Sequence, residues 1–299
     1  MKIVFMGTPE FAIPSLRILR ENKHEILAVV TTPDKERGRG QKVTYTPVKT
    51  FALENNIPVL QPVSLKEPEF ISALKDLNAD LYVVVAFRIL PKEVFTIPPK
   101  GAFNLHGSLL PKYRGAAPIQ WALINGDTET GVTTFFLQDK VDTGNIIISA
   151  SLTVEPDDDF GSLHDKMSLL GASVLLKTVE LIENGNVQVQ PQNDSLASPA
   201  PKITREICQI NWSMPADKIH NLIRGLSPYP AAFFINKGKI IKVYKSALCS
   251  ENLSAGEIYQ TRTRIIIGCG SGTIEILKLQ PEGRKRMTAA EFLRGYSLT

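Results

Sequence analysis

The sequence predicts an α/β protein in which a doubly wound, mostly parallel, Rossmann-like sheet is followed by a small, OB-like β-barrel. First, the apolar run 2–6, a helical apolar stripe over residues 11–21 and the apolar run 26–30 form a strand–helix–strand unit. Second, the long amphipathic segment Phe160–Glu183 is typical of a helix that packs on a sheet. Third, short β-like runs joined by glycine and polar turns follow residue 203, which is the pattern of a small barrel.

The same patterns predict the remaining elements. Helices are expected over residues 50–55, 67–77, 117–124 and 215–224, with a short one between Pro91 and Pro98. Strands are expected over 59–60, 81–87, 101–106, 130–137 and 145–152, and in the barrel over 232–235, 239–246, 255–259, 264–269 and 272–279. A Pro-, Ser-, Asn- and Asp-containing stretch without periodicity predicts a linker over 189–203, between a first domain of residues 1–188 and a second of residues 204–299.

The turn after the first strand is Gly7-Thr8-Pro9. It predicts that Thr8 caps the following helix and that Pro9 lies in its first turn. Because the turn is not G-x-G-x-x-G, a dinucleotide site is unsupported.

Composition excludes several classes of protein. A hydrophobic content of 43% and a charged content of 21% are ordinary for a globular chain, and no apolar run is long enough to span a bilayer. Cys208, Cys249 and Cys269 form no CxxC pair, which argues against a disulfide framework and a zinc site. Thr8-Pro9-Glu10 interrupts the first apolar run, so no signal peptide is expected. We therefore expect a cytoplasmic protein without a metal.

Charge is distributed unevenly along the chain. Residues 1–200 carry 19 basic and 23 acidic side chains, a net charge of −4, whereas residues 201–299 carry 15 and 7, a net charge of +8. A basic C-terminal third suggests a polyanionic partner, and a well-solvated surface is an equal alternative.

Three side chains near the centre of the chain could act together. Asn104 and His106 are two residues apart in the apolar-flanked run 101–106, so a strand would place them on one face. Asp142 follows the β-like run 130–137 in a polar turn closed by Thr143 and Gly144. An amide, an imidazole and a carboxylate at neighbouring strand ends can stabilise an oxyanion and move a proton. The alternative is a set of satisfied structural groups, since spacing does not show that Asp142 reaches His106.

Residues 33–49 form a long polar loop that is rich in cations. Loops of more than about 12 residues are usually functional or disordered. This one could close over a phosphate-bearing substrate, or it could be a solvated loop. Its cations are Lys35, Arg37, Arg39, Lys42 and Lys49.

Several motifs together resemble the formyltransferases that use 10-formyltetrahydrofolate. They are Asn104-x-His106-x-Ser108-Leu109-Leu110-Pro111, the RGAAPI of 114–119, Asp142-Thr143-Gly144, the SPYP of 227–230 and the LQPEGRKRM of 279–287. The resemblance runs nearly from end to end of the chain.

This resemblance implies transfer of a formyl group from 10-formyltetrahydrofolate, the co-substrate, to the α-amino group of methionine on initiator tRNA. Asn104, His106 and Asp142 fall on the family's catalytic trio, with no metal and no covalent intermediate. The implied folate-binding residues are Phe87, Arg88, Ile89, Leu90, Ser108, Leu109, Leu110, Pro111 and Asp139. The implied tRNA-binding residues are Arg37, Arg39 and Lys42 in the loop and Lys237, Lys245, Arg284 and Arg286 in the basic barrel.

One loop departs from the family pattern. Relatives often have A-Y-G-x-I-L-P after the strand at 81–87, and this chain has the shorter Ala86-Phe87-Arg88-Ile89-Leu90-Pro91 without the glycine. The loop is expected to line the pterin pocket, where Arg88 either covers the pterin or faces solvent.

Other readings share parts of this pattern. The acceptor could be an amino-sugar nucleotide or a small amino-ribonucleotide, although neither needs a basic second domain. A hydrolase that removes formyl from folate would share His106 and Asp142, and an RNA-binding protein with an inactive enzymatic body would share the barrel. We expect a monomer.

Overall fold

The computed structural model describes residues 1–37 and 42–299. The chain forms two compact units, and each draws on several stretches of sequence. The first unit comprises Met1–Gly115, Gly131–Leu152 and Asp165–Pro199, and the second comprises Ala116–Thr130, Thr153–His164 and Ala200–Thr299. The domain boundaries expected from sequence, 1–188, 189–203 and 204–299, stay a prediction.

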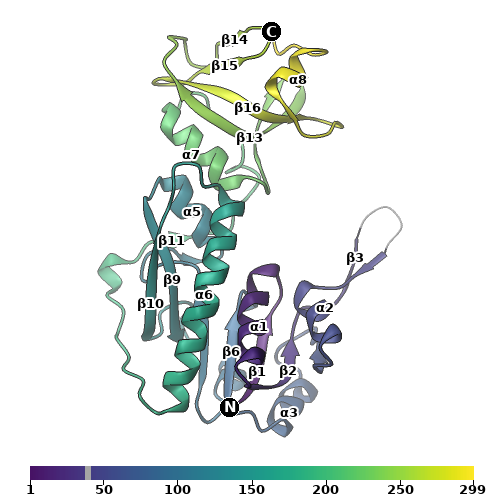
Figure 1. The fold of residues 1–299 in the computed structure, drawn as a ribbon, viewed down its shortest axis with the longest axis vertical. Coiled ribbons are helices and arrows are strands. Elements are labelled where there is room, and N and C mark those ends of the chain that lie inside the picture. Colours follow the sequence, from purple (N-terminus) through teal and green to yellow (C-terminus); the bar gives the residue numbers. More distant parts are fainter. Residues whose placement is uncertain (38–41) are drawn as a thin grey trace. The chain divides into compact units, whose positions relative to one another are not determined.

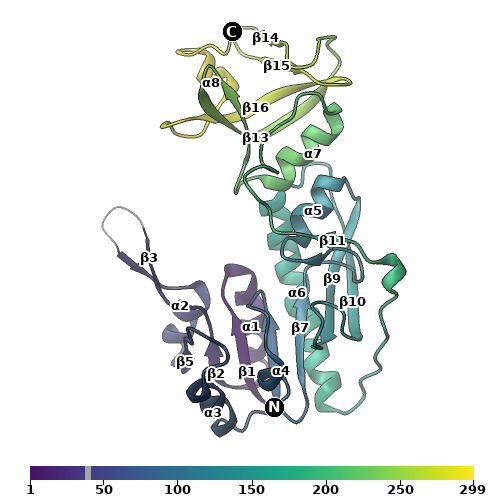
Figure 2. The ribbon, with the colours of Figure 1, turned by 180° about the vertical axis from the view of Figure 1, so that it is seen from behind.

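The first unit is built on a seven-stranded sheet of order β10-β9-β7-β6-β1-β2-β5 (Figures 1 and 2). The pairs among β5, β2, β1, β6 and β7 are parallel, whereas β9 runs antiparallel to β7. This confirms the doubly wound, mostly parallel sheet. The strands are β1 (Lys2–Gly7), β2 (Glu25–Val30), β5 (Val59–Leu60), β6 (Leu81–Val85), β7 (Ala102–His106), β9 (Glu129–Phe136) and β10 (Ile146–Thr153).

Helices cover both faces of this sheet. Successive side chains of a strand point to opposite faces, and in β1 and β6 apolar side chains are buried on both faces. Val4, Met6, Tyr82 and Val84 form a buried cluster with side chains of α3 and α4. On the other face, Ser168 of α6 donates to the carbonyl of Phe11, and Figure 1 shows α1 and α6 in front of the strands. The helices of this unit are η1 (Glu10–Ala12), α1 (Ile13–Glu21), α2 (Pro47–Glu54), α3 (Pro68–Asp76), α4 (Lys92–Phe95) and most of α6 (Phe160–Glu183).

The predicted cap at Thr8 is wrong. The chain enters α1 through the 3-10 turn η1, whose N-cap is Pro9 in an extended conformation and makes no side-chain hydrogen bond. The hydroxyl of Thr8 is buried and has no hydrogen-bond partner among the described residues. The Thr8-Pro9 sequence was misleading because α1 begins only at Ile13, about one helical turn after the position that this sequence suggested.

The described residues of the polar segment 33–49 include two strands and the start of a helix, which corrects the expectation of a single long loop. β3 (Lys35–Arg37) pairs antiparallel with β4 (Lys42–Thr44), and α2 already begins at Pro47. Arg39 lies outside the described residues. The hairpin was missed because each strand is only three residues long and is highly charged.

The second unit is a curled antiparallel half-barrel with the helices α5, α7 and α8, which agrees with the predicted small β-domain. Its sheet has the order β12-β13-β16-β15-β14, with β17 paired to β16. Its elements are α5 (Pro118–Asn125), α7 (Ala216–Leu226), β12 (Ala232–Asn236), β13 (Lys239–Cys249), β14 (Ile258–Gln260), β15 (Ile265–Gly268), β16 (Thr273–Pro281), β17 (Met287–Thr288) and α8 (Ala289–Leu293).

The sequence patterns did not predict α8. Its N-terminus carries a capping box, in which Thr288 accepts from the amide of Glu291 and the carboxylate of Glu291 accepts from Thr288. The motif T-x-x-E was therefore a readable signal. Over the described part of the chain, no helix combines the length and the apolar character that crossing a membrane requires.

Candidate active site

The carboxyl end of β7 carries two of the three expected catalytic side chains. Asn104 and His106 share a strand face with Ala102, which joins the cluster under α3 and α4. Leu105 points to the other face, where it approaches Gly171 of α6. Asn104 is half-buried, and its amide has no hydrogen-bond partner among residues 1–37 and 42–299. That amide is therefore available to a ligand.

His106 is held in one orientation by the backbone. Its ring is 7% exposed, and Nε2 lies 2.8 Å from the carbonyl oxygen of Tyr113. Because a carbonyl only accepts, Nε2 carries a hydrogen and donates it. Phe135 packs edge-on against the ring, at 6.5 Å between centroids. This leaves Nδ1 as the nitrogen that can face a reacting group.

Asp142 does reach His106. Its Oδ2 lies 4.0 Å from Nδ1 of His106, which is an ion-pair distance and longer than a direct hydrogen bond. The route differs from the one expected, because β9 is antiparallel and Phe136 pairs with Phe103 at the start of β7. The chain after β9 carries Asp142 back to His106. The Nε2–H tautomer satisfies the carbonyl of Tyr113, and Nδ1 is the ring nitrogen on the side of the carboxylate.

Backbone geometry holds Asp142 in place. The residue has a positive φ of 55°, and its Oδ2 accepts from the amide of Gly115 at 2.9 Å. A Cβ on Gly144 would lie 1.7 Å from the carbonyl oxygen of Phe136, so only glycine fits there. Left-handed backbone in a non-glycine residue costs about 1–3 kcal/mol and often marks a functional site.

Two residues that the sequence analysis did not assign to the site support this loop. The amide nitrogen of Gln192 donates to the carbonyls of Asp142 and Gly144, at 2.9 and 2.8 Å. Arg114 in turn donates to Oε1 of Gln192 at 2.7 Å and pairs with Asp194 at 2.7 Å. Arg114 was visible as part of the RGAAPI motif. Gln192 lies in the stretch expected to be a linker, and nothing local distinguishes it.

The segment Ser108 to Pro111 folds back on the sheet. Ser108 donates its hydroxyl to the carbonyl of Lys112 at 2.6 Å, and the amide of Leu110 donates to Thr133 at 3.1 Å. Leu110 is buried, Leu109 and Pro111 are partly exposed, and the Leu110–Pro111 peptide is cis. The hydroxyl of Ser108 is thus committed to an internal contact, and the partly exposed side chains are the ones open to a ligand.

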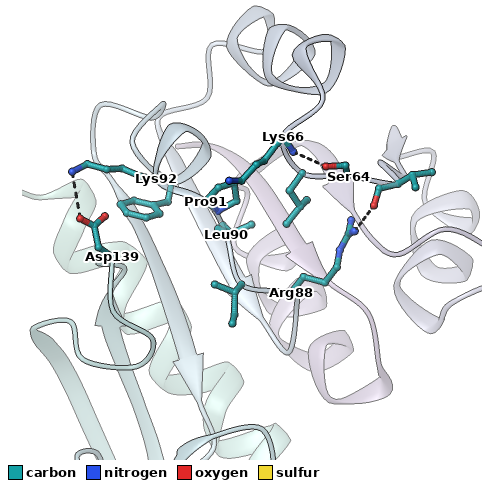
Figure 3. A pocket seen from close by; sticks show the side chains of 11 residues that line it. Ser64, Lys66, Arg88, Leu90, Pro91, Lys92 and Asp139 are labelled. Atoms are coloured by element: carbon teal, nitrogen blue, oxygen red, sulfur yellow. Dashed lines mark hydrogen bonds and ion pairs between the residues drawn. The ribbon is translucent and has the colours of Figure 1, made fainter.

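A pocket of about 560 Å³ opens beside the loops that follow β5 and β6 (Figure 3). Four of the expected folate-binding residues line it: Arg88, Ile89, Leu90 and Asp139. Phe87 instead packs against the buried cluster below. Sequence reasoning missed the other lining residues, of which four lie in the loop after β5 and three lie at the start of α4 or within it. They are Val63, Ser64, Leu65, Lys66, Pro91, Lys92 and Phe95.

The side chain of Arg88 lines this pocket and is also bonded to the neighbouring loop, so it does not simply face solvent. Its two terminal nitrogens donate to the carbonyls of Val63 and Pro62, at 2.9 and 2.8 Å, and its Nε is buried with no partner among the described residues. Burial lowers the pKa of this guanidinium, while Glu67 acts in the opposite direction. Lys92 and Asp139 form a separate pair at 3.4 Å on the exposed rim.

The expected tRNA-binding residues are divided between the two units. In the first unit, Arg37 pairs with Lys42 through the β3–β4 backbone. In the second, Lys237 lies in the turn after β12 and donates to the carbonyl of Thr299, and Lys245 is exposed on β13. Arg284 and Arg286 occupy the turn between β16 and β17 and lie over aromatic rings, at 5.8 Å from Tyr296 and 3.5 Å from Tyr244.

Comparisons with known proteins assign the family. A family model described as formyl transferase matches residues 1–179, and one described as formyl transferase, C-terminal domain, matches residues 202–297. The chain belongs to the formyl transferase family, which confirms the resemblance found in the motifs. It is similar to the methionyl-tRNA formyltransferases of Flavobacterium johnsoniae, at 47% identity, and of Caldanaerobacter subterraneus, at 46%. Both matches cover 100% of this chain, with 97% and 98% of the respective relatives.

Solved structures support the fold. WlaRD, a sugar 3N-formyl transferase crystallised with dTDP and 5-N-formyl-THF, has a TM-score of 0.71 at 23% identity, covering 95% of this chain and 99% of its own. The N-formyltransferase of Helicobacter canadensis, in complex with folinic acid and dTDP-3-aminofucose, has a TM-score of 0.69 at 23% identity, covering 92% and 98%.

Proposed function

We propose that this protein transfers the formyl group of 10-formyltetrahydrofolate to the α-amino group of methionine on initiator tRNA. One observation carries the proposal: in a chain similar over its whole length to methionyl-tRNA formyltransferases, Asn104 shares a strand face with His106, whose Nδ1 lies 4.0 Å from Asp142. These groups have the donors and the carboxylate that attack on a formyl carbon requires.

The reaction forms one bond and breaks one. The neutral amine attacks the formyl carbon, a tetrahedral oxyanion forms, and the bond from that carbon to the folate nitrogen then breaks. The amide of Asn104 and the Nδ1 hydrogen of His106 donate to the oxyanion, and each such donor typically contributes ~3 kcal/mol. Asp142 stabilises the imidazolium and carries the amine proton towards the leaving nitrogen.

The pocket beside β6 is the proposed site of the folate co-substrate. Leu65, Leu90 and Phe95 supply apolar surface for rings, and Lys66 and Arg88 supply positive charge for carboxylates. Asp139 at its rim and Asp142 beside His106 both lie on the loop between β9 and β10. No group of three or more His, Cys, Asp or Glu side chains that could hold a metal ion occurs in the described ranges 1–37 and 42–299.

The tRNA is proposed to contact both units. Arg37 and Lys42 lie on β3 and β4, and with Arg39, which lies between them in the sequence, they would meet the acceptor end. Arg284 and Arg286 extend from an exposed turn of the half-barrel. Exposed arginines on a scaffold are suited to phosphates. We propose further that the protein acts as a monomer in the cytoplasm, where translation begins.

Labelled formyl transfer tests this proposal directly. The protein is offered 10-formyltetrahydrofolate with methionyl initiator tRNA, methionyl elongator tRNA or free methionine. Transfer to the initiator alone is expected. Folate binding without transfer to any of the three would contradict the proposed acceptor and favour an amino-sugar nucleotide, a small amino-ribonucleotide or water in its place.

A further inference from the structure

A closed ring of three side chains lies at the base of the β3–β4 hairpin. Asp34 immediately precedes β3, Lys49 lies in the first turn of α2, and Gln61 follows β5. β5 pairs in parallel with β2, so the segments that carry Asp34 and Gln61 leave the sheet at the same end, and α2 brings Lys49 to them. All three residues belong to the first compact unit.

Each member of this ring is bonded to the other two. Lys49 Nζ lies 2.5 Å from Oδ2 of Asp34 and 2.8 Å from Oε1 of Gln61. The amide nitrogen of Gln61 donates to Oδ1 of Asp34 at 2.9 Å, so both carboxylate oxygens accept. Lys49 and Asp34 are only 13% and 25% exposed, so solvent screens the pair less than it screens a surface salt bridge.

Further contacts tie the ring to both legs of the hairpin. Gln61 also donates to the carbonyl of Thr32 at 2.9 Å, on the outgoing leg. On the returning leg, the ammonium of Lys49 lies 4.1 Å from the centre of the Tyr45 ring. The hydroxyls of Thr31 and Thr46 are 2.9 Å apart and link the two legs directly. The pKa of the Asp34 carboxyl lies below its ordinary value because Lys49 donates to it, and Gln61 lowers it further.

The ring changes the role of Lys49. Sequence analysis counted Lys49 among the cations that could meet a phosphate, but its charge is neutralised inside the ring. Lys49 is thus a partly buried cation at the base of the hairpin, bonded to two residues on neighbouring segments.

We infer that Asp34, Lys49 and Gln61 are positioning residues, which hold the β3–β4 hairpin in the orientation that presents its cations to the acceptor end of the tRNA. The inference rests on the proposed function for its acceptor, although the ring itself does not. None of the three residues needs to touch tRNA or folate. Their effect is transmitted through the hairpin backbone.

Two single variants and their combination test the inference on the intact protein. Asp34→Asn and Lys49→Met each keep the shape of the side chain and break the ring. Each should raise KM for methionyl initiator tRNA about tenfold, because a small misplacement of a contacting segment is costly. The KM for 10-formyltetrahydrofolate should stay unchanged. The double variant should be clearly less impaired than the sum of the two singles, since both remove one shared interaction.

Lys75→Met is the matched control. It makes the same chemical change on the exposed side of α3 and should leave both KM values as they are. A second readout needs no substrate. Amide hydrogen exchange over residues 35–37 and 42–44 should become about tenfold faster in the ring variants while the amides of β1 and β6 keep their protection.

The outcomes separate the two proposals. If the unaltered protein transfers formyl and the ring variants keep its KM for tRNA, the positioning role is overturned. An equal loss of donor and tRNA binding overturns it too, because the ring would then support the fold in general. If the unaltered protein transfers formyl to none of the tRNAs, the proposed function fails and the positioning role in that reaction fails with it. The exchange measurement then still decides whether the ring holds the hairpin.

Discussion

The ionisable side chains at the carboxyl end of β7 and those in the turn between β16 and β17 differ in how exposed they are and in what contacts them. At β7, His106 and Asp142 are largely buried, and backbone groups of Tyr113 and Gly115 fix both. In the turn, Arg284 and Arg286 are exposed and lie on the rings of Tyr296 and Tyr244.

The difference follows from what each region has to do. A group of fixed position and low exposure is suited to a charge that exists only in the transition state. An exposed guanidinium is suited to a phosphate backbone, where contacts release counterions and binding falls with salt. The first region should therefore control kcat, and the second should control KM and its salt dependence.

The largest expected effect is at β7. Asn104→Ala or His106→Ala should each lower the rate of transfer by about 10²-fold or more, because each removes an oxyanion donor. Single-turnover transfer measures the loss, and a separate binding assay should find the affinity for tRNA retained. Asn186→Ala, at an exposed position after α6, is the control and should have no effect. Normal transfer by either active-site variant would refute this assignment.

The next effect concerns the support of Asp142. Gln192→Ala removes the donor to the carbonyls of Asp142 and Gly144, so the carboxylate should lose its fixed position and kcat should fall about tenfold. Gln190→Ala makes the same change two residues away, on an exposed side chain whose backbone pairs with Ile146. Equal rates for the two variants would show that Gln192 does not matter for catalysis.

A smaller effect is expected in the turn of the half-barrel. Replacing both Arg284 and Arg286 by Ala should reduce the slope of log Kd against log salt by about 2, since each arginine accounts for roughly one phosphate. The kcat should be unaffected. Arg17→Ala is the matched control, because this exposed arginine also lies over an aromatic ring, Phe51, but in the first unit. A slope that does not change would exclude the turn from the tRNA interface.

The smallest effect contrasts two lysine–aspartate pairs of the first unit. Lys92→Met breaks a pair whose side chains are 69% and 66% exposed, and the free energy of unfolding should fall by less than about 1 kcal/mol. Lys49→Met leaves the half-buried Asp34 without its cation and should cost about 1–3 kcal/mol. Denaturant unfolding measures both. Equal costs would mean that burial does not distinguish the pairs.

Sequence patterns predicted the features of the fold and the site that depend on residues close together in the sequence. The strands β1 and β6 are continuous apolar runs because both faces of the sheet are covered, and α6 was predicted with its observed bounds because one apolar stripe runs along its length. Asn104 and His106 lie on one strand face because the period of a strand is two.

Contacts between distant residues were not readable in this way. Gln192 lies 50 residues from Asp142 in a stretch without periodicity, and only the folded chain brings them together. The ring of Asp34, Lys49 and Gln61 joins three segments for the same reason. The β3–β4 hairpin was hidden because its strands are short and charged, whereas the start of α8 had a capping box that could have been read.

The second unit is assembled from three separate stretches of the chain, and this has a consequence for recombination between related enzymes. α5 lies far from the half-barrel in sequence, yet it packs on α7: a Cβ on Gly225 would meet Ile124, and one on Gly126 would meet Asn221. A chimaera cut near residue 200 would therefore join α7 of one parent to α5 of another. Exchanging the C-terminal module between homologues as an intact cassette requires that residues 116–130 and 153–164 travel with it.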